Sequence, residues 1–589
     1  LLKELALKGK LVIVVIHQPS SDIYKMFDKL MILDTGGFPV YFGNPIEAIS
    51  YFKAQINDVT SDDVECFNCG NVNPEQVFNI LEGQVLDEFG QVTYKRRVSP
   101  SEWNEKYLDN IVIEDADIDL SQPLPEGSTI PSRLQQFKVF VTRDVLSKFA
   151  DMQYMVINFL ETPVLAFILA MLIKYFANDD VGFIFRENDN LPAYIFMCVV
   201  VALFFGLTVS AEEIIKDAKI LKRESFLNLS RSSYLGSKIM ILFTISAVQT
   251  MAFVLVGNWI MEIKGMNMAY FLVLFSTSCF ANMLGLNISA SFRNVVTIYI
   301  LIPFLIIPQL LLSGVIVKFD KLNPQFSSDA QVPFTGEVMT SKWAYEALAV
   351  YQFKKNKFSK DFFEFDKGIS EATYKKDYWI PEVRNRAIEL GDLVRMRNFT
   401  PKALKTIELL KNELNDQAFL TPELVFEDIS ELDTTVITKV TLESIKEYLD
   451  QLARHYARQR NTIDTEKDKL ISSKIRTAEE RVAFNKMKDD YFNESLSDLV
   501  LNSNDFYRII ERDGHLIQKL NPIYRDPFNS NFLRSQFFAP RKKILSYYID
   551  TYWANVIVIW LMSLFLMFTL YFNVLERSLS FFGEMVEKI

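Results

Sequence analysis

The chain has 589 residues, with 63 Lys and Arg against 73 Asp and Glu, a formal charge of −10 and a mean hydropathy of +0.10. Hydrophobic residues make up 49%, which excludes a disordered or collagen-like chain, and the acidic balance argues against nucleic-acid binding through bulk positive charge. A positive mean hydropathy with 23% charged residues means that the apolar residues are concentrated in part of the chain, as in a membrane protein.

The first 56 residues have strand and helix patterns. Residues 11–16 (LVIVVI) are a continuous apolar run, which predicts a parallel strand buried on both faces, with His17 at its carboxyl end. The following elements are expected to be a helix at 21–27, strands at 29–34 and 39–42, and a helix after Asn44. This order predicts part of an α/β domain.

Residues 57–130 are predicted to be an accessory segment and linker. Cys66 and Cys69 form a CxxC pair, but no second pair or nearby His completes a zinc site, so a structural role is favoured and no metal is expected. Residues 85–130 are polar and rich in Pro, and we expect a solvated linker there.

Six stretches are long and apolar enough to cross a membrane, which takes about 20 residues in a helix. They are 154–176, 191–210, 238–260, 269–290, 295–317 and 553–573. Residues 131–150 alternate apolar and basic residues at helical spacing and predict an amphipathic elbow helix before the first span. The fold class is therefore mainly α: spans one to five at 151–317, span six at 552–575, and a partial α/β domain before them.

Lys and Arg are concentrated in the connection between spans two and three. Others lie before span one, between spans four and five and after span six: Arg143, Lys148, Arg293, Arg577 and Lys588. By the positive-inside rule, both termini are predicted to be cytoplasmic, including the tail at 576–589. The long connection 318–551 then lies outside. The expected location is a bacterial inner membrane or a plasma membrane.

The long connection is predicted to be an all-α extracytoplasmic domain, with helical patterns at 401–414, 441–460 and 465–492. His455 and His515 have no evident nucleophile or metal partner in it. Within the spans, Glu161 and Gln249 are polar, and either helix packing or a substrate path explains them.

Residues 12–52 (VIVVIHQPSSDIYKMFDKLMILDTGGFPVYFGNPIEAISYF) resemble the last part of the nucleotide-binding domain in ABC transporters of the ABCG (White) subfamily. The resemblance implies that His17 is the switch histidine, which contacts the terminal phosphate of ATP. The sequence contains no G-x-x-x-x-G-K-[ST] phosphate loop. We therefore expect the chain to begin inside a nucleotide-binding domain: ATP and Mg²⁺ belong to the intact protein, and no cofactor is expected for this chain alone.

The segment RESFLNLSRSSYLGSKI resembles the cytoplasmic segment of the same family that presses on the nucleotide-binding domain. This implies a coupling role for Arg223, Glu224, Arg231, Tyr234 and Lys238.

Farther along, LLLSGVIVKFDKLNP and SKWAYEALAVYQF resemble the ABC-2 membrane-domain pattern. The resemblance implies that Leu310, Leu311 and Leu312 form an apolar gate near the two-fold axis of a dimer. The alternative is that these leucines simply face lipid or neighbouring helices.

The resemblance implies a half-transporter that couples ATP to export of a lipophilic or amphipathic small molecule or lipid. The expected partners of the half-transporter are membrane lipid and a second half-transporter, in a homodimer or heterodimer. No nucleic acid is expected as a partner. One alternative is a membrane-anchored scaffold or sensor acting through its external helical domain. An ion-coupled secondary transporter is another, but it predicts paired half-repeats with broken helices, which the sequence does not contain.

Overall fold

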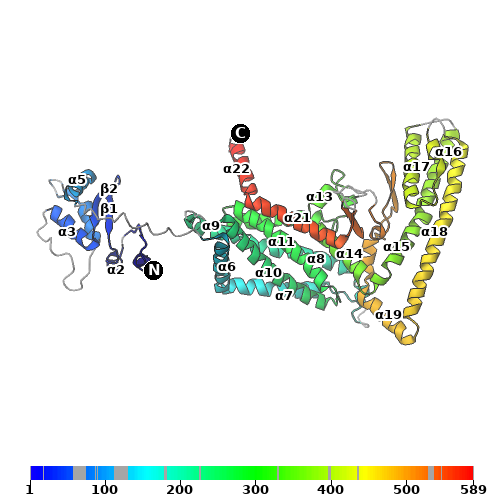
Figure 1. The fold of residues 1–589 in the computed structure, drawn as a ribbon, viewed down its shortest axis with the longest axis horizontal. Helices are drawn as coiled ribbons and strands as arrows, with labels where there is room; N and C mark the ends of the chain where they lie inside the picture. The colour runs from blue at the N-terminus through cyan, green and yellow to red at the C-terminus, as the bar shows by residue number, and fades with distance from the viewer. Residues whose placement is uncertain are drawn as a thin grey trace, which may run out of the picture. The chain divides into compact units, whose positions relative to one another are not determined.

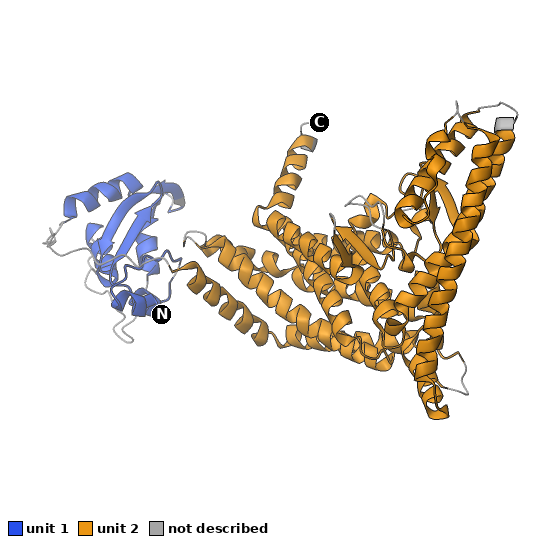
Figure 2. Cartoon of the chain, turned by 45° about the vertical axis from the view of Figure 1, so that its right-hand side comes forward, with its two compact units in different colours: residues 1–128 blue, residues 129–589 orange. Residues whose placement is uncertain are grey.

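The computed structural model describes the ranges 2–17, 19–56, 74–86, 88, 90–111, 131–177, 182–224, 227, 229–327, 331–395, 400–433, 437–527, 536–544 and 547–587. The chain divides into two compact units, residues 1–128 and 129–589, which are coloured separately in Figure 2. Each unit is described by itself. The CxxC pair at Cys66 and Cys69 lies outside the described residues.

Unit 1 consists of two antiparallel hairpins and short helices. Its elements are α1 (Leu2–Leu7), α2 (Ser21–Tyr24), β1 (Leu30–Asp34), β2 (Phe38–Gly43), α3 (Pro45–Gln55), α4 (Glu75–Leu81), β3 (Gln84–Leu86), β4 (Val92–Arg96) and α5 (Pro100–Asn110). The hairpin and helix predicted around Asn44 are confirmed, and the Asn44 side chain caps α3 by accepting from the Ile46 amide at 3.0 Å.

The strand predicted at 11–16 is wrong for this structure. These residues have no regular secondary structure, and Leu11, Ile13 and Val15 are 90, 82 and 86% exposed. A buried parallel strand needs hydrogen-bonding neighbours, and the described strands of unit 1 pair only as the hairpins β1–β2 and β3–β4. The helix expected at 21–27 is likewise reduced to the single turn α2.

The solvated linker predicted from residue 85 is also wrong over its first part, because β3, β4 and α5 are folded elements of unit 1. Trp103 of α5 is fully buried, with its ring centroid 5.3 Å from that of Phe52. Arg96 of β4 pairs with Asp34 of β1 at 2.7 Å, which joins the two hairpins. A capping box between Ser99 and Glu102 starts α5, and this signal was present in the sequence.

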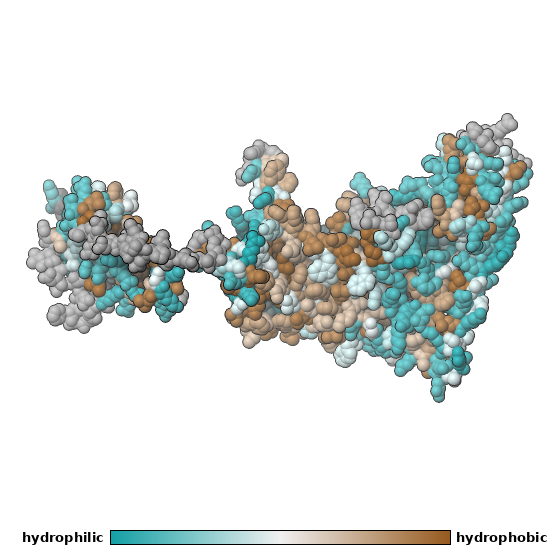
Figure 3. Space-filling view, viewed as in Figure 1, coloured by the Kyte–Doolittle hydropathy of each residue, from teal (hydrophilic) through white to brown (hydrophobic). Residues whose placement is uncertain are grey.

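Unit 2 begins with a membrane domain of long apolar helices (Figure 1). Its helices are α6 (Arg133–Ala150), α7 (Met152–Ile173), α8 (Leu191–Ser210), α9 (Glu213–Glu224), α10 (Arg231–Ile260), α11 (Asn267–Ser291), α12 (Val295–Leu311), α21 (Thr551–Tyr571) and α22 (Val574–Glu587). Apolar residues gather over these helices, whereas hydrophilic residues cover the domain that follows them in Figure 3. A helix forms at the predicted elbow position, and five of the six predicted spans are helices long and apolar enough to cross a membrane.

The predicted fifth span differs from the others. Among the described residues, five helices have the length and composition to cross a membrane, and α12 is a shorter apolar helix of 17 residues. It ends at Leu311 instead of 317, because Ser313 accepts the Val315 amide and Gly314 adopts a positive φ of 78°, which turns the chain.

Glycines allow α8 and α11 to pack closely. A Cβ at Gly206 would lie 2.4 Å from the Ser278 carbonyl oxygen, and one at Gly285 would lie 2.0 Å from Ser210 Oγ. Small residues at such crossings let two membrane helices approach and gain van der Waals contact. We therefore regard α8 and α11 as the tightly packed centre of the membrane domain.

The inserted domain, residues 318–550, lies between α12 and α21. Its main elements are α13 (Phe334–Glu337), α14 (Thr340–Lys355), α15 (Phe363–Tyr374), the π-helical turn η5 (Lys375–Trp379), α16 (Ile380–Arg395), α17 (Pro401–Leu420), α18 (Lys439–Lys474), α19 (Ala478–Tyr491), α20 (Glu494–Val500), β5 (Ile509–Arg512), β6 (His515–Gln518), β7 (Arg541–Ile544) and β8 (Tyr547–Asp550). It is mainly helical, but the all-α prediction is wrong because β5–β6 and β7–β8 form hairpins.

The long helix α18 supplies much of the core of the inserted domain. Leu442, Ile445, Leu449 and Leu452 recur at helical spacing and are buried against α15–α17. The sequence predicts a break near 460–465, whereas α18 runs without interruption to Lys474 and α19 starts after a capping box at Thr477. Charged residues continue the helix there because helical propensity does not require an apolar face.

Buried charges join the inserted domain to the last span. Glu346 of α14 is fully buried and accepts hydrogen bonds from Lys542 Nζ of β7 at 2.6 Å and from Asn555 Nδ2 of α21 at 3.0 Å. Lys342 lies 3.4 Å from the same carboxylate. An unpaired buried charge is costly, so these partners hold α14, β7 and α21 together.

The inserted domain also contacts the connection between α7 and α8. Asn493 Nδ2 donates to the carbonyl oxygens of Phe185 and Asn188 at 2.9 and 2.8 Å, and Arg186 pairs with Asp489 at 2.8 Å. The two segments therefore lie on the same side of the membrane domain.

Candidate functional site

A group of buried charges lies where α6, α9 and α10 meet. Lys238 Nζ of α10 is 2.7 Å from Asp144 of α6, 3.1 Å from Glu213 and 3.0 Å from Asp217 of α9. Lys148 of α6 makes a second ion pair with Glu213. Only 4% of the Lys238 side chain and 8% of the Glu213 side chain are exposed. One lysine therefore bridges three helices.

We call these groups, with Tyr234, the elbow cluster: Asp144, Lys148, Glu213, Asp217, Tyr234 and Lys238. Tyr234 donates its hydroxyl hydrogen bond to Asp217 Oδ2 at 3.0 Å. Two ammonium groups face three carboxylates, which gives a formal charge of −1 if all five are ionised. Charges withdrawn from water must be compensated by partners, so a helix cannot leave this junction without exposing or orphaning a charge.

The local sequence explains why these side chains converge. Asp144 and Lys148, Glu213 and Asp217, and Tyr234 and Lys238 are each four residues apart, so each pair projects from one face of its helix. α6 is fixed at its start by a capping box between Ser132 and Gln135, and Ser233 Oγ donates to the Arg133 carbonyl oxygen at 2.9 Å. The start of α6 therefore lies beside the start of α10.

The structure separates the five predicted coupling residues into different roles. Tyr234 and Lys238 belong to the elbow cluster. Glu224 accepts hydrogen bonds from Arg143 Nη1 of α6 at 2.9 and 3.1 Å, and Arg223 is exposed. Arg231 donates to the carbonyl oxygen of Leu570, at 3.1 Å, and to Asn573, so it holds the end of α21.

Sequence reasoning missed Asp144, Glu213 and Asp217, and it used Lys148 only for orientation. The sequence does contain one sign of the cluster: ionisable residues recur at four-residue spacing before span one, after span two and before span three. Charge compensation across three helices could not be read from the sequence, because it depends on which helix faces meet.

His17 lies in unit 1 and is exposed, on the segment without regular structure after residue 16. A nucleotide does not fit the residues present around His17. The sequence has no phosphate loop, and the His17 side chain is exposed, without surrounding groups among the described residues. The residues present do not build an ATP site by themselves.

The other predicted residues are dispersed through the membrane domain. Gln249 of α10 is buried and donates to the Asn158 carbonyl oxygen of α7 at 3.0 Å, while Glu161 is exposed on α7. At the end of α12, Leu310 packs against the main core and Leu311 is 45% exposed. Leu312 is half-buried. Glu161 is three residues farther along α7 than the Asn158 carbonyl oxygen that Gln249 contacts.

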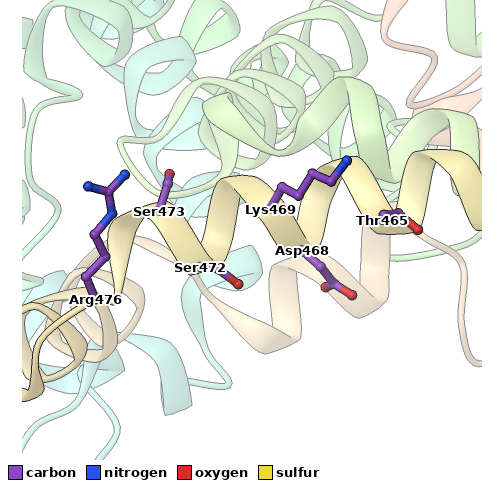
Figure 4. Close-up of a pocket in the computed structure, with 6 residues that line it drawn as sticks. All are labelled: Thr465, Asp468, Lys469, Ser472, Ser473 and Arg476. Carbon is purple, nitrogen blue, oxygen red and sulfur yellow. The ribbon is translucent and has the colours of Figure 1, made fainter.

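The His residues of the inserted domain have no catalytic arrangement. His515 Nδ1 lies 3.3 Å from Asp416, and His455 packs edge-on against Tyr456. A shallow hollow of about 460 Å³ lies farther along α18, lined by Thr465, Asp468, Lys469, Ser472, Ser473 and Arg476. Its side chains point in different directions in Figure 4, so they do not converge on one ligand.

An ion-pair junction in the inserted domain leads to a stability prediction. Asp526 lies between Lys367 Nζ of α15, at 2.5 Å, and Arg541 Nε of β7, at 3.0 Å. Burial raises the pKa of Asp526, but the hydrogen bonds and charges of Arg541 and Lys367 outweigh it and hold the pKa below its ordinary value. The carboxylate therefore stabilises the fold above its unfolded-state pKa of about 3.9, and this stability is lost as the pH falls through the lowered pKa.

We expect Asp526→Asn to cost about 1–3 kcal/mol at pH 7, because it removes the carboxylate charge that pairs with both Lys367 and Arg541. The apparent unfolding temperature, followed by intrinsic fluorescence in detergent, should fall by about 2–4 °C, and the difference should shrink as the pH falls below about 4. Asp392→Asn, at an exposed position of α16, is the control. Equal unfolding temperatures of Asp526→Asn and wild type at pH 7 would contradict the assignment.

Two parts of the chain match known protein families. Residues 135–353 match the family described as ABC-2 type transporter, and residues 17–114 match a second family of the same description. The first match covers the elbow helix, the membrane helices to α12 and the start of the inserted domain as far as α14. These matches and the apolar helices show an integral membrane protein with an ABC-2 type membrane domain.

The chain is also similar in sequence to individual proteins, several of which are named as G-family ABC transporters. The chain is 47% identical over 53 residues to ABC transporter G family member 14 of Arabidopsis thaliana, covering 9% of this chain and 8% of that protein. It is 44% identical over 52 residues to Protein white of Drosophila melanogaster, covering 9% and 7%. It is 24% identical over 202 residues to human ATP-binding cassette sub-family G member 8, covering 32% and 29%.

These matches span less than a third of each relative. Together with the two family matches, they support an ABCG (White)-type protein with an ABC-2 type membrane domain.

Proposed function

We propose that this chain works as a half-transporter, in which ATP binding and hydrolysis drive export of a lipophilic or amphipathic compound. The observation that carries the proposal is the elbow cluster, which ties α6, α9 and α10 through Lys238. Two members of the cluster, Tyr234 and Lys238, belong to the segment that resembles the family's contact with the nucleotide-binding domain.

The chain's own residues suggest how motion would pass through this junction. A displacement of the loop before α10 would carry Lys238 and, with it, α6 and α9, because their charges share that ammonium group. Arg231 would carry the end of α21 as well. Buried ion pairs resist separation, so the three helices would move together instead of sliding individually.

ATP and Mg²⁺ belong to the proposed whole protein. A second half-transporter, identical or different, is proposed as the partner, since each ATP site in the resembled family is made from two nucleotide-binding domains. His17 would contribute an imidazole donor near the terminal phosphate, where developing negative charge needs stabilisation.

The proposal can be tested with inside-out vesicles from cells that express the full-length protein. A panel of fluorescent amphipathic dyes is offered with ATP or with a non-hydrolysable ATP analogue. We expect at least one dye to accumulate with ATP only, and less of it with Lys238→Met. Dye distribution that is independent of ATP and equal to that of empty vesicles would contradict transport and favour the scaffold function.

The orientation of the inserted domain follows from the proposed topology and is tested separately. In a cysteine-free background, Gln451→Cys at an exposed position of α18 should react with a membrane-impermeant maleimide on intact cells. The control, Lys219→Cys on exposed α9 surface, should react only after permeabilisation. The reverse pattern would overturn the predicted orientation.

A further inference from the structure

The last helix, α22, has two distinct faces that the transport function does not explain. With 3.6 residues per turn, Leu575, Leu579, Phe581, Phe582 and Met585 fall on one side, and Glu576, Arg577, Ser580 and Glu584 on the other. Phe581 and Phe582 are 61 and 60% exposed, and Leu579 and Met585 are 40 and 49% exposed. An apolar face is therefore uncovered along three turns.

The direction of α22 is set at its junction with α21. Asn573 adopts a left-handed conformation with φ of 52°, which ends α21 and redirects the chain. Arg231 of α10 holds this turn by donating to the Leu570 carbonyl oxygen and to the Asn573 side chain. In Figures 1 and 2, α22 turns away from α21 and runs across its direction.

The junction places α22 at the same end of the membrane domain as the elbow helix. Arg231 is the first residue of α10, and the start of α10 contacts the start of α6 through Ser233 and Arg133. In Figure 1, α6 also runs across the direction of α7 and α10. Because α21 crosses the membrane, a helix that follows it after a two-residue link and runs crosswise lies at the level of the lipid headgroups.

From this placement we propose that α22 lies in the membrane interface as a second amphipathic anchor, with Leu579, Phe582 and Met585 in the lipid. The adjoining end of α21 is also apolar: Phe568 in α21 and Phe572 just after it are 58 and 44% exposed. The polar face carries one positive residue, Arg577, and two negative residues, Glu576 and Glu584. Because this face is not basic, the attachment depends on burial of apolar side chains and not on anionic lipid.

The anchor has a mechanical consequence that goes beyond the proposed transport. A helix held in the interface fixes the end of α21 relative to the bilayer surface. Arg231 connects that fixed point to the first turn of α10. The interface would then resist axial movement of α10 and α21 together.

The test uses the full-length protein in phosphatidylcholine vesicles, with single spin labels placed in a cysteine-free background. Labels at Leu579, Phe582 and Met585 report on the apolar face, and labels at Glu576, Ser580 and Glu584 are the matched controls on the same helix. Collision with dissolved oxygen measures lipid exposure, and collision with a water-soluble nickel complex measures water exposure.

We expect oxygen accessibility to exceed nickel accessibility at the three apolar-face positions and the reverse at the three polar-face positions, giving a period near 3.6 residues. Strong nickel accessibility at all six positions would place α22 in water and overturn the proposal. Apolar-face labels that are immobile and inaccessible to both reagents would also overturn it, since they would show a protein cover such as a second copy.

Discussion

Lys238→Met is expected to uncouple ATP hydrolysis from transport. The substitution removes the ammonium group shared by Asp144, Glu213 and Asp217 and leaves Lys148 as the one lysine of the elbow cluster. Breaking a buried ion pair by removing one partner costs about 3–5 kcal/mol. Helices α6, α9 and α10 would then no longer be held together, and dye accumulation per ATP hydrolysed should fall by about tenfold or more, which corresponds to at least 1.4 kcal/mol of lost coupling.

Two further variants separate lost coupling from failure to fold. Glu213→Gln added to Lys238→Met restores the formal charge of the cluster to −1 and should recover part of the transport. Lys219→Met, at an exposed position of α9, should behave as wild type. Size-exclusion profiles in detergent show whether each variant is folded. A well-folded Lys238→Met protein that moves dye at the wild-type ratio to ATP would refute the coupling role.

His17→Ala is expected to lower ATP turnover by the full-length protein by about 100-fold, the scale for losing a positioned donor or proton carrier at a reacting phosphate. ATP binding should stay close to wild type, because the imidazole is proposed to act on the terminal phosphate. Phosphate release measures turnover, and a fluorescent ATP analogue measures binding.

His455→Ala in α18 is the matched control, because it removes an imidazole from the inserted domain instead of unit 1. It should leave turnover unchanged. Unchanged turnover in His17→Ala would reject the switch-histidine assignment, and loss of ATP binding together with turnover would assign His17 to binding instead.

The membrane helices could be predicted closely because their signal is local. A run of apolar residues marks a span irrespective of its neighbours, and α7, α8, α10, α11 and α21 lie where the sequence places them. The end of α12 was misplaced because Val315, Ile316 and Val317 are apolar, whereas the turn at Ser313 and Gly314 decides where the helix stops.

The elements that the sequence misassigned depend on contacts distant in the chain. Residues 11–16 have the composition of a buried strand, but a strand forms only when another strand pairs with it. The hairpins β5–β6 and β7–β8 are short and mixed in polarity, so their alternation was hidden among the helical patterns of the inserted domain. Trp103 was assigned to a linker because its partner, Phe52, is 51 residues earlier.

The candidate site also could be predicted only in part, because some of its residues are recognisable locally and others depend on packing. Tyr234 and Lys238 were found from residue types that resemble a family segment, whereas Asp144, Glu213 and Asp217 became apparent only from the packing of α6 and α9 against α10. A sequence can indicate that a charge near a span needs a partner. Which carboxylate supplies that partner is decided by tertiary structure.

The most direct test of the account is the rate of vanadate-sensitive ATP hydrolysis by the full-length protein in lipid vesicles, measured with and without a panel of amphipathic compounds. We expect basal hydrolysis that some of these compounds increase. Absence of hydrolysis above that of protein-free vesicles, with every compound, would contradict an ATP-driven transporter.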